Sequence, residues 1–376
     1  MKVVFNGIKN KNGEIVKRRY ATVDPANNRT VTATLGSVVT MSQALYERVS
    51  NDFPGSFEVA DEASFAVEKA TRRIQTMSGG TYVVYFANGI GNFVILTAAL
   101  REVSKKHNVV IVVEGSDEKF SAIKSISKWP VVREKDAPVD AEKRFCIWGS
   151  SHVFKALPAD TVIQHKPYFG PENEKHESEF YGDLFVTTPS KTTVKKTREI
   201  DLFLGEKERC VAFVNGSAAS NGRKKWSNEK WIELAGELIK RGFKIVFLGN
   251  EKERDDTGKA LVEAHTSGVW NLAGAVTMSG AADVLKECAF AITTDTALMH
   301  IADSVGTKTF ALWGPTSLVK NDGLNGNVIQ VFSKTLPSCA PCYGTDQYSR
   351  CSTNQCMKEL VVDDVVATLK EHNELC

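Results

Sequence analysis

Hydroxyl, carboxylate and imidazole side chains gather in the stretch ITTDTALMH, residues 292–300. Thr296 and His300 are four residues apart on a predicted helix that begins just after Asp295. Because helical side chains lean toward the N-terminus, we expect His300 to point back toward Asp295 and Thr296. The free N–H groups and dipole of such a helix end bind phosphate, but the dipole contributes only about 0.3–1 kcal/mol. A tightly held diphosphate therefore requires a cation as well.

A second loop, VNGSAASNGRKKWS at residues 214–227, supplies that cation. It offers small residues for close backbone approach and then a basic run that includes Lys224 and Lys225. The loop matches neither the P-loop pattern nor the dinucleotide-binding pattern G-x-G-x-x-G. Taken singly, these features are typical of a capped helix, a solvated basic face and a structural histidine. Their combination at equivalent strand ends of one domain indicates a phosphate pocket.

Apolar strands alternate with amphipathic helices along the segments that must position these residues. Predicted strands are TYVVYFA, NVVIVVE and RFCIWGS in a first series, then CVAFVNG, KIVFLGN, FAITTD and KTFALWG in a second. A helix capped by Ser227 and ended by Gly242 follows the first strand of the second series. This alternation is typical of parallel strands with crossover helices, so we predict two successive doubly wound sheets. Their ligands should lie beyond the carboxyl ends of the strands, in the crevice between the halves.

The length of 376 residues suits two domains with a small addition, and 42% hydrophobic and 24% charged residues are typical of a globular protein. We predict a small N-terminal accessory unit at 1–75, with β-prone pieces at 30–34 and 37–40 and a helix from Ser42. The predicted domains are residues 80–195, residues 203–360, and a C-terminal helix and tail at 361–376. A polar linker is expected at 191–202. The N-terminal unit suits either selection of a partner or self-assembly into a homo-oligomer.

Charge and hydropathy exclude several classes of protein. The formal net charge of +2 gives little reason to expect binding to nucleic acid or to an anionic membrane. The first residues lack the apolar middle section of a secretion signal. The apolar stretch 82–100 is interrupted by Asn88, Gly89, Gly91 and Asn92, which argues against a membrane span. We therefore expect a cytoplasmic protein.

Five ordered motifs carry a resemblance to a known family. NGIGNFVILTAALREV, HESEFYGDLF, NGSAASNGRKKW, LGNEKE and TDTALMHIADSVGTKTFALWGPTS together resemble glycosyltransferase family nine, the heptosyltransferases, over residues 80 to 370. The resemblance implies the GT-B fold, two Rossmann-like domains facing a cleft. It also implies inverting transfer of a sugar, usually heptose from ADP-heptose, without a catalytic metal. The implied acceptor is a lipopolysaccharide core sugar, another glycan or a protein side chain.

The resemblance also implies roles for individual residues. The donor sugar nucleotide binds in the C-terminal domain and the acceptor in the N-terminal one, near Gly89, Gly91 and Asn92. The implied donor contacts are the phosphate-loop residues Asn215, Gly216 and Ser217, the cations Lys224 or Lys225, the nucleoside-binding Glu251, and the phosphate-turn residues Asp295, Thr296 and His300.

Asn92 departs from the family pattern. It stands where the heptosyltransferases have the aspartate that deprotonates the acceptor, and loss of a general base typically costs about 10²–10⁴ in rate. His152 and Glu114 are the candidate replacements on the acceptor side, although a loop histidine and a solvated carboxylate are their ordinary interpretations. The alternative is a catalytically impaired protein that still binds a nucleotide sugar. An epimerase of similar architecture is a third hypothesis, for which no second motif is found.

Four cysteines near the C-terminus have the spacing C-x2-C-x8-C-x4-C: Cys339, Cys342, Cys351 and Cys356. Four thiolates suit a tetrahedral zinc or iron centre, and some relatives in the resembled family carry such a metal-bound finger. A closed four-ligand shell would make the metal structural. The alternative is four reduced thiols in a loop. Cys146, Cys210 and Cys288 lie within strand or helix patterns and are expected in the core.

Overall fold

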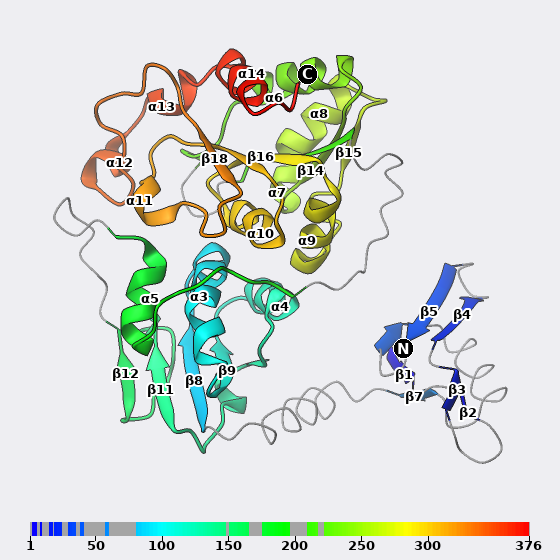
Figure 1. Ribbon diagram of the computed structural model, residues 1–376, viewed down its shortest axis with the longest axis vertical. Helices are drawn as coiled ribbons and strands as arrows, with labels where there is room; N and C mark the ends of the chain where they lie inside the picture. The colour runs from blue at the N-terminus through cyan, green and yellow to red at the C-terminus, as the bar shows by residue number, and fades with distance from the viewer. Residues whose placement is uncertain are drawn as a thin grey trace. The chain divides into compact units, whose positions relative to one another are not determined.

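The computed structural model describes residues 80–147, 150–164, 175–195, 209–216 and 222–375 in full, and strands between residues 2 and 59 by their backbone course. The chain divides into two compact units, Met1–Thr76 and Met77–Cys376 (Figure 1). The helix predicted from Ser42 lies outside the described residues.

The described part of the first unit consists of short antiparallel strands. They form a three-stranded sheet of order β6-β1-β7 and the hairpin-like pairs β2-β3 and β4-β5. The bounds are β1 Lys2–Phe5, β2 Ile8–Lys9, β3 Ile15–Lys17, β4 Arg19–Asp24, β5 Arg29–Thr34, β6 Val38–Thr40 and β7 Phe57–Val59. Strands β5 and β6 fall on the two predicted β-prone pieces, which confirms a β-containing N-terminal unit.

The second unit begins with a parallel sheet of order β10-β9-β8-β11-β12. Its strands are β8 Thr81–Phe86, β9 Asn108–Val113, β10 Val131–Val132, β11 Lys143–Cys146 and β12 Thr161–Ile163. The helices of this half are α3 Ile90–Val103, α4 Asp117–Ile126, the 3₁₀ turn Glu134–Asp136 and α5 Glu177–Phe185. Strand β9 is buried along its whole length, as expected for a central strand covered on both faces.

A second parallel sheet has the order β15-β14-β13-β16-β17-β18. Its strands are β13 Cys210–Val214, β14 Lys244–Leu248, β15 Val269–Asn271, β16 Phe290–Thr294, β17 Thr309–Leu312 and β18 Val328–Val331. The helices are α6 Asn228–Lys240, α7 Glu251–Glu253, the π-helical turn Arg254–Gly258, α8 Lys259–Ala264, α9 Met278–Glu287, α10 Ala297–Val305, α11 Leu318–Asn321, α12 Asp346–Arg350, α13 Gln355–Lys358 and α14 Val362–Glu371. In both sheets the strand order reverses beside the first strand, and such a reversal opens a crevice for ligands.

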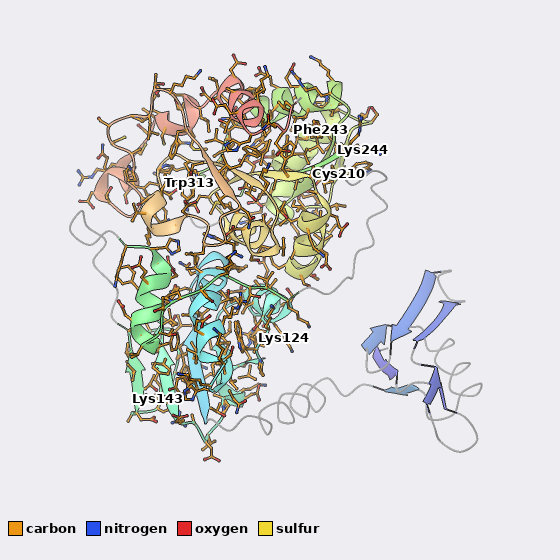
Figure 2. All side chains as sticks on the ribbon, viewed as in Figure 1. Lys124, Lys143, Cys210, Phe243, Lys244 and Trp313 are labelled. Carbon is orange, nitrogen blue, oxygen red and sulfur yellow. The ribbon has the colours of Figure 1, made fainter. Side chains whose placement is uncertain are left out.

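Two helices of the C-terminal half, α6 and α10, end where the sequence predicts. Helix α6 starts after Ser227 and is followed by Gly242 at φ +84°, while α10 ends at Gly306 at φ +87°. A positive φ at these positions favours glycine. The core between the helices and the sheet holds Cys210 on β13 and Trp313 after β17, both fully buried (Figure 2). Cys146 and Cys288 are buried too, so the three predicted core cysteines are confirmed.

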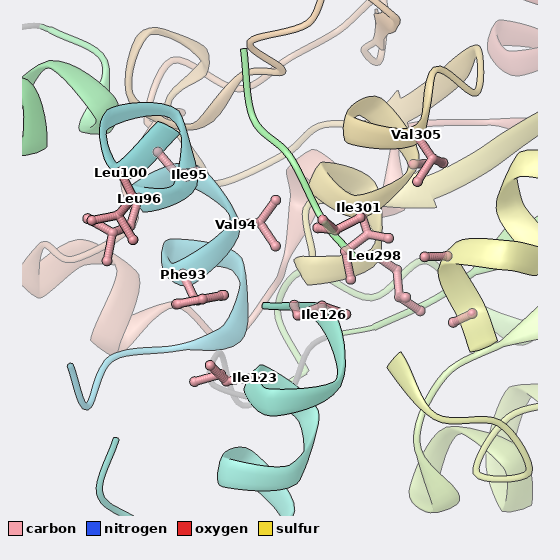
Figure 3. Packing of buried hydrophobic residues seen from close by; sticks show 14 of the residues in the cluster. Phe93, Val94, Ile95, Leu96, Leu100, Ile123, Ile126, Leu298, Ile301 and Val305 are labelled. Atoms are coloured by element: carbon pink, nitrogen blue, oxygen red, sulfur yellow. The ribbon is translucent and has the colours of Figure 1, made fainter. Parts of the chain in front are cut away.

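Helices from the two halves pack against each other between the sheets. Helix α10 contacts α3 and α9 contacts α4, so a double layer of helices separates the two sheets (Figure 1). Val94 of α3, Ile126 of α4 and Leu298 and Ile301 of α10 belong to one buried cluster (Figure 3). Among the helices that the structure describes, none has the length and apolar character that a membrane crossing requires.

The segment predicted as a linker is buried against both halves over residues 192–194. Thr192 donates both its backbone N–H and its hydroxyl to Asn325 Oδ1, at 2.8 and 3.0 Å, and so connects the two halves. Thr193 and Val194 are buried, and Thr193 N–H donates to Thr97 Oγ1. Thr192 and Thr193 are therefore buried and make hydrogen bonds that are buried or partly buried. Residues 196–202 of the predicted linker lie outside the described part of the chain.

Candidate functional site

A pocket of about 320 Å³ lies between the two halves of the second unit, where the carboxyl ends of β8, β13, β14 and β16 converge. The N-terminal half contributes the turn after β8, α4 and the start of α5. The C-terminal half contributes the turns after β13, β14 and β16. The lining residues are Gly89, Ile90, Gly91, Asn92, Ile95, Glu118, Glu177, Val214, Gly216, Lys224, Gly249, Asn250, Glu253, Met278, Asp295, Thr296, Ala297, Leu298, His300, Lys320, Asn321 and Tyr343.

Lys224 and Asp295 form an ion pair in this pocket. Lys224 Nζ lies 2.7 Å from Asp295 Oδ2, and the two side chains are only 15% and 7% exposed. The residues are far apart in sequence and meet because β13 and β16 are parallel neighbours. Lys224 Nζ also lies 4.5 Å from the centre of the Tyr343 ring. Low exposure strengthens the pair and makes removal of either partner costly.

The N-terminus of α10 has unfilled hydrogen-bonding capacity. Thr296 is its N-cap residue, yet no described side chain caps this end, and the first turn carries no acidic residue. The Thr296 hydroxyl is buried and has no hydrogen-bond partner among the described residues. A Cβ on Gly216 would lie 2.7 Å from Thr296 Cγ2, so this approach of the two turns requires glycine. The N-terminus of α10, the Thr296 hydroxyl and the Lys224 ammonium group together can hold an anion with two or more oxygens.

His300 lies one turn further along α10, at the boundary between the halves. The side chain is buried, and burial lowers its pKa to about 4 although Asp295 acts in the opposite direction. The imidazole is therefore neutral at physiological pH. A Cβ on Gly91 would lie 3.4 Å from His300 Cδ2, which places the ring directly against the turn that carries Asn92.

Asn92 contacts a carboxylate from another element. Its Nδ2 donates to Glu177 Oε1 at 2.6 Å, and the hydroxyl of Tyr181 donates to the same oxygen. Glu177 is fully buried, and its Oε2 has no hydrogen-bond partner within the described part of the chain. No pattern in the sequence predicted this role of Glu177. The residue stands in the motif HESEFYGDLF, but no spacing along the chain places it beside Asn92, 85 residues earlier.

Two residues of the predicted donor loop serve the structure around the pocket. Asn215 is fully buried: it accepts from Trp226 N–H and donates to the Trp226 carbonyl and to Thr257 Oγ1. Lys225 pairs with Asp256 Oδ2 at 2.8 Å. Neither lines the pocket, so of the two candidate cations Lys224 is the one at the site. Ser217 lies outside the described residues.

The turn after β14 places a different acid at the pocket from the one predicted. Glu251 is exposed and lies outside the lining, whereas Asn250 and Glu253 belong to it. The two pair as a capping box, with Glu253 N–H donating to Asn250 Oδ1 at 3.0 Å and Asn250 N–H donating to Glu253 Oε2 at 2.9 Å. The spacing N-x-x-E is the available signal for this arrangement.

The two candidate replacement bases do not reach the pocket. His152 is exposed and absent from the lining. Glu114 is also outside the lining and accepts from Glu134 N–H at 2.8 Å, with Arg133 NH1 3.5 Å away.

The cysteine-rich segment covers the donor loop. Arg223 donates to the carbonyls of Ser349 and Cys351, both at 3.1 Å, and Tyr343 lines the pocket. Burial, with a smaller contribution from the other three thiols of the segment, raises the pKa of the Cys356 thiol to about 11, so the four lie near one another. Nevertheless, no group of three or more His, Cys, Asp or Glu side chains among the described residues is arranged to hold a metal ion. The donor set suits zinc or iron chemically, but these side-chain positions do not form a site.

Known proteins share both sequence and fold with this chain. Residues 166–361 match the model of glycosyltransferase family 9 (heptosyltransferase). Lipooligosaccharide heptosyltransferase 2 of Haemophilus influenzae is 33% identical over 128 residues, which are 33% of this chain and 36% of that protein. The match thus spans about a third of the length of this curated relative.

Two solved structures resemble the fold. The E. coli ADP-heptose LPS heptosyltransferase II has a TM-score of 0.55 at 16% identity and covers 78% of this chain and 99% of its own. The iron-containing dodecameric glycosyltransferase TibC of enterotoxigenic E. coli has a TM-score of 0.54 at 12% identity. The similarity covers 80% of this chain and 78% of TibC. Two facing parallel-sheet halves of this kind form the GT-B fold, which confirms the predicted fold class. The chain belongs to glycosyltransferase family 9, the heptosyltransferase family.

Proposed function

We propose that the protein is an inverting glycosyltransferase that moves a sugar, with heptose as the first candidate, from a nucleoside-diphosphate donor to a glycan or protein acceptor. The observation that carries the proposal is the Lys224–Asp295 pair, 2.7 Å apart at an uncapped helix N-terminus inside a pocket shared by both halves. Family membership and the names of relatives, heptosyltransferases and an ADP-heptose enzyme, support the choice of sugar and nucleotide.

In this proposal the donor diphosphate binds at the start of α10. Backbone N–H groups of the first turn and the Thr296 hydroxyl donate to phosphate oxygens, and Lys224 neutralises their charge. The helix dipole adds only about 0.3–1 kcal/mol, or up to ~2 when partly buried, so Lys224 dominates. The diphosphate then shares Lys224 with Asp295 or replaces Asp295 as its partner. The nucleoside extends toward Asn250 and Glu253 at the end of β14.

The same groups serve the chemical step. As the bond between the anomeric carbon and the phosphate oxygen breaks, the nucleoside diphosphate gains negative charge. Lys224 and the N-terminus of α10 are fixed in a partly buried pocket where that charge develops, so they stabilise the transition state without a catalytic metal. Neutral His300 fills the space between this site and the Gly91 turn on the acceptor side.

A screen of nucleotide sugars tests the proposal. The protein is incubated with ADP-, GDP- and UDP-sugars together with glycan and peptide acceptors, and binding and released nucleoside diphosphate are measured. We expect acceptor-dependent release with ADP-heptose. Donor binding without release for every acceptor would instead support the nucleotide-sugar-binding alternative. That alternative rests on Asn92 alone, and a carboxylate in contact with Asn92 weakens it.

A structural zinc or iron in the four-cysteine segment is a further part of the proposal. Four thiols are suitable metal ligands, and the other three thiols raise the pKa of Cys356, which places them near it. The TibC neighbour is described as iron-containing, which also supports a metal. Metal analysis of protein purified without added metal should find about one ion per chain, lost in Cys342→Ser. Metal-free protein would leave the four thiols reduced.

Assembly and location are also proposals. The β-containing N-terminal unit is assigned to acceptor selection or self-assembly; the dodecameric TibC neighbour supports assembly. Sedimentation of the full chain and of a variant lacking residues 1–76 distinguishes the two roles. The cytoplasmic location stays a prediction.

A further inference from the structure

Glu177 is a buried acid on the acceptor side of the pocket that the donor chemistry above does not use. It is the first residue of α5 and lines the pocket together with Asn92. Its Oε1 accepts from Asn92 Nδ2 at 2.6 Å and from the Tyr181 hydroxyl at 2.5 Å, whereas Oε2 is buried without a partner among the described residues. Buried polar oxygens are normally hydrogen-bonded, so Oε2 has an unfilled hydrogen-bonding capacity in a residue that lines the pocket.

We propose that Glu177 is the general base that activates the acceptor hydroxyl, and that Asn92 positions it. The inference rests on the proposed transferase function. An amide cannot take up a proton, but the Asn92 amide holds Oε1 in place and leaves Oε2 as the free acceptor. The base is thus retained within one hydrogen bond of the position where the resembled family carries its aspartate.

The proposed step is a single displacement at the anomeric carbon of the donor. The acceptor hydroxyl gives its proton to Glu177 Oε2 while its oxygen bonds to the anomeric carbon of the donor. The bond from that carbon to the phosphate oxygen breaks on the opposite face, and its electron pair leaves with the nucleoside diphosphate.

The other titratable groups near this end of the pocket fit the role less well. His300 lines the pocket, but its pKa of about 4 makes it a weak proton acceptor at neutral pH. Glu118 lines it from an exposed position on α4, where water competes for the carboxylate. His176, the N-cap of α5, is engaged with Ser178 and with the Asp322 carbonyl.

Glu177→Gln is the first test, with Glu179→Gln as its matched control. Gln at 177 keeps an oxygen for Asn92 and Tyr181 but cannot take a proton. Glu179 is an exposed acid on the same helix, and Gln preserves its capping role. We expect E177Q to lower nucleoside diphosphate release by about 10²–10⁴-fold, with ADP affinity within about twofold of the wild type, and E179Q to match the wild type.

Exchanging the acid and the amide between residues 92 and 177 distinguishes a catalytic role of the carboxylate from a purely structural one. The variant N92D/E177Q keeps one carboxylate and one amide in contact but moves the acid to residue 92. We expect it to recover at least about tenfold over E177Q. E177Q with release within about threefold of the wild type would overturn the inference alone. Loss of ADP affinity in both E177Q and the exchanged variant would assign Glu177 to folding and also overturn it. Wild-type protein that binds ADP but releases no nucleoside diphosphate from the donor with any acceptor would overturn the transferase proposal, and the inference with it.

Discussion

The donor and acceptor sides of the pocket are built in different ways. On the donor side, Lys224 and Asp295 both follow strands of one sheet, and the parallel pairing of β13 with β16 brings them together. On the acceptor side, Asn92 follows strand β8 but its carboxylate partner Glu177 comes from the start of a helix later in the chain. One side therefore follows from sheet topology, whereas the other depends on how α5 packs beside α3.

This difference explains what the sequence could predict. Parallel strands align their carboxyl ends, so the order of strands and polar turns was sufficient to predict that Asp295, Thr296 and Lys224 share a pocket. The helix dipole and leaning side chains also placed His300 at that end of α10. The direction in which α5 enters the pocket is set by tertiary packing, which no local pattern records. Asn92 was recognised as the unusual residue, but the acid beside it was not.

Two further differences have local causes. The acid after β14 was expected at Glu251, but a capping box turns Glu253 into the pocket instead. The segment at 191–195 was expected to be the start of a polar linker, and its threonines hydrogen-bond to groups on both halves. Polarity alone does not distinguish a side chain in water from one that serves a buried hydrogen bond.

On the donor side, the largest expected effect comes from removing the cation. Lys224→Met should weaken ADP binding by roughly 100-fold or more, because a partly buried charge pair to phosphate is lost and Asp295 is left unpaired. Calorimetric titration with ADP measures the loss. The matched control is Lys225→Met, whose partner Asp256 lies outside the pocket lining and whose ADP affinity should change little. Equal effects of both variants would remove the distinction between the two lysines.

His300, which lies between the two sides, should make stability depend on pH. Its pKa is lowered to about 4, so between pH 6.5 and 4 the unfolded chain binds a proton that the folded chain does not. Folding stability should therefore fall as the pH drops through this range, by about 3 kcal/mol in total, and stay constant above it. Urea unfolding of the wild type and of His300→Gln at pH 7 and pH 4 measures the difference, and identical pH dependence would show that His300 is protonated normally.

Tyr181 should affect the acceptor side alone. Tyr181→Phe removes the hydroxyl that donates to Glu177 Oε1, and a hydrogen bond to a charged group is worth about 1.5–3 kcal/mol. We expect turnover to fall about tenfold or more, with unchanged ADP affinity. Steady-state kinetics and titration on the same sample check both values. A variant that loses ADP affinity instead would show that the two sides are not separable.

Tyr343 is expected to give the smallest effect, on the donor side. Its ring lies 4.5 Å from Lys224 Nζ, and an exposed cation–π contact contributes about 0.5–1 kcal/mol. Tyr343→Leu should weaken ADP binding by about two- to fivefold without changing turnover at saturation. Tyr343→Phe keeps the ring and serves as the control; if it weakens binding as much as the leucine variant, the hydroxyl rather than the ring matters.

A crystal structure of the protein with ADP tests the donor site most directly. We predict that the diphosphate lies at the N-terminus of α10, within hydrogen-bond distance of Lys224 Nζ and the Thr296 hydroxyl. A diphosphate bound elsewhere, with the Lys224–Asp295 pair undisturbed and no contact to α10, would contradict the proposed transferase chemistry.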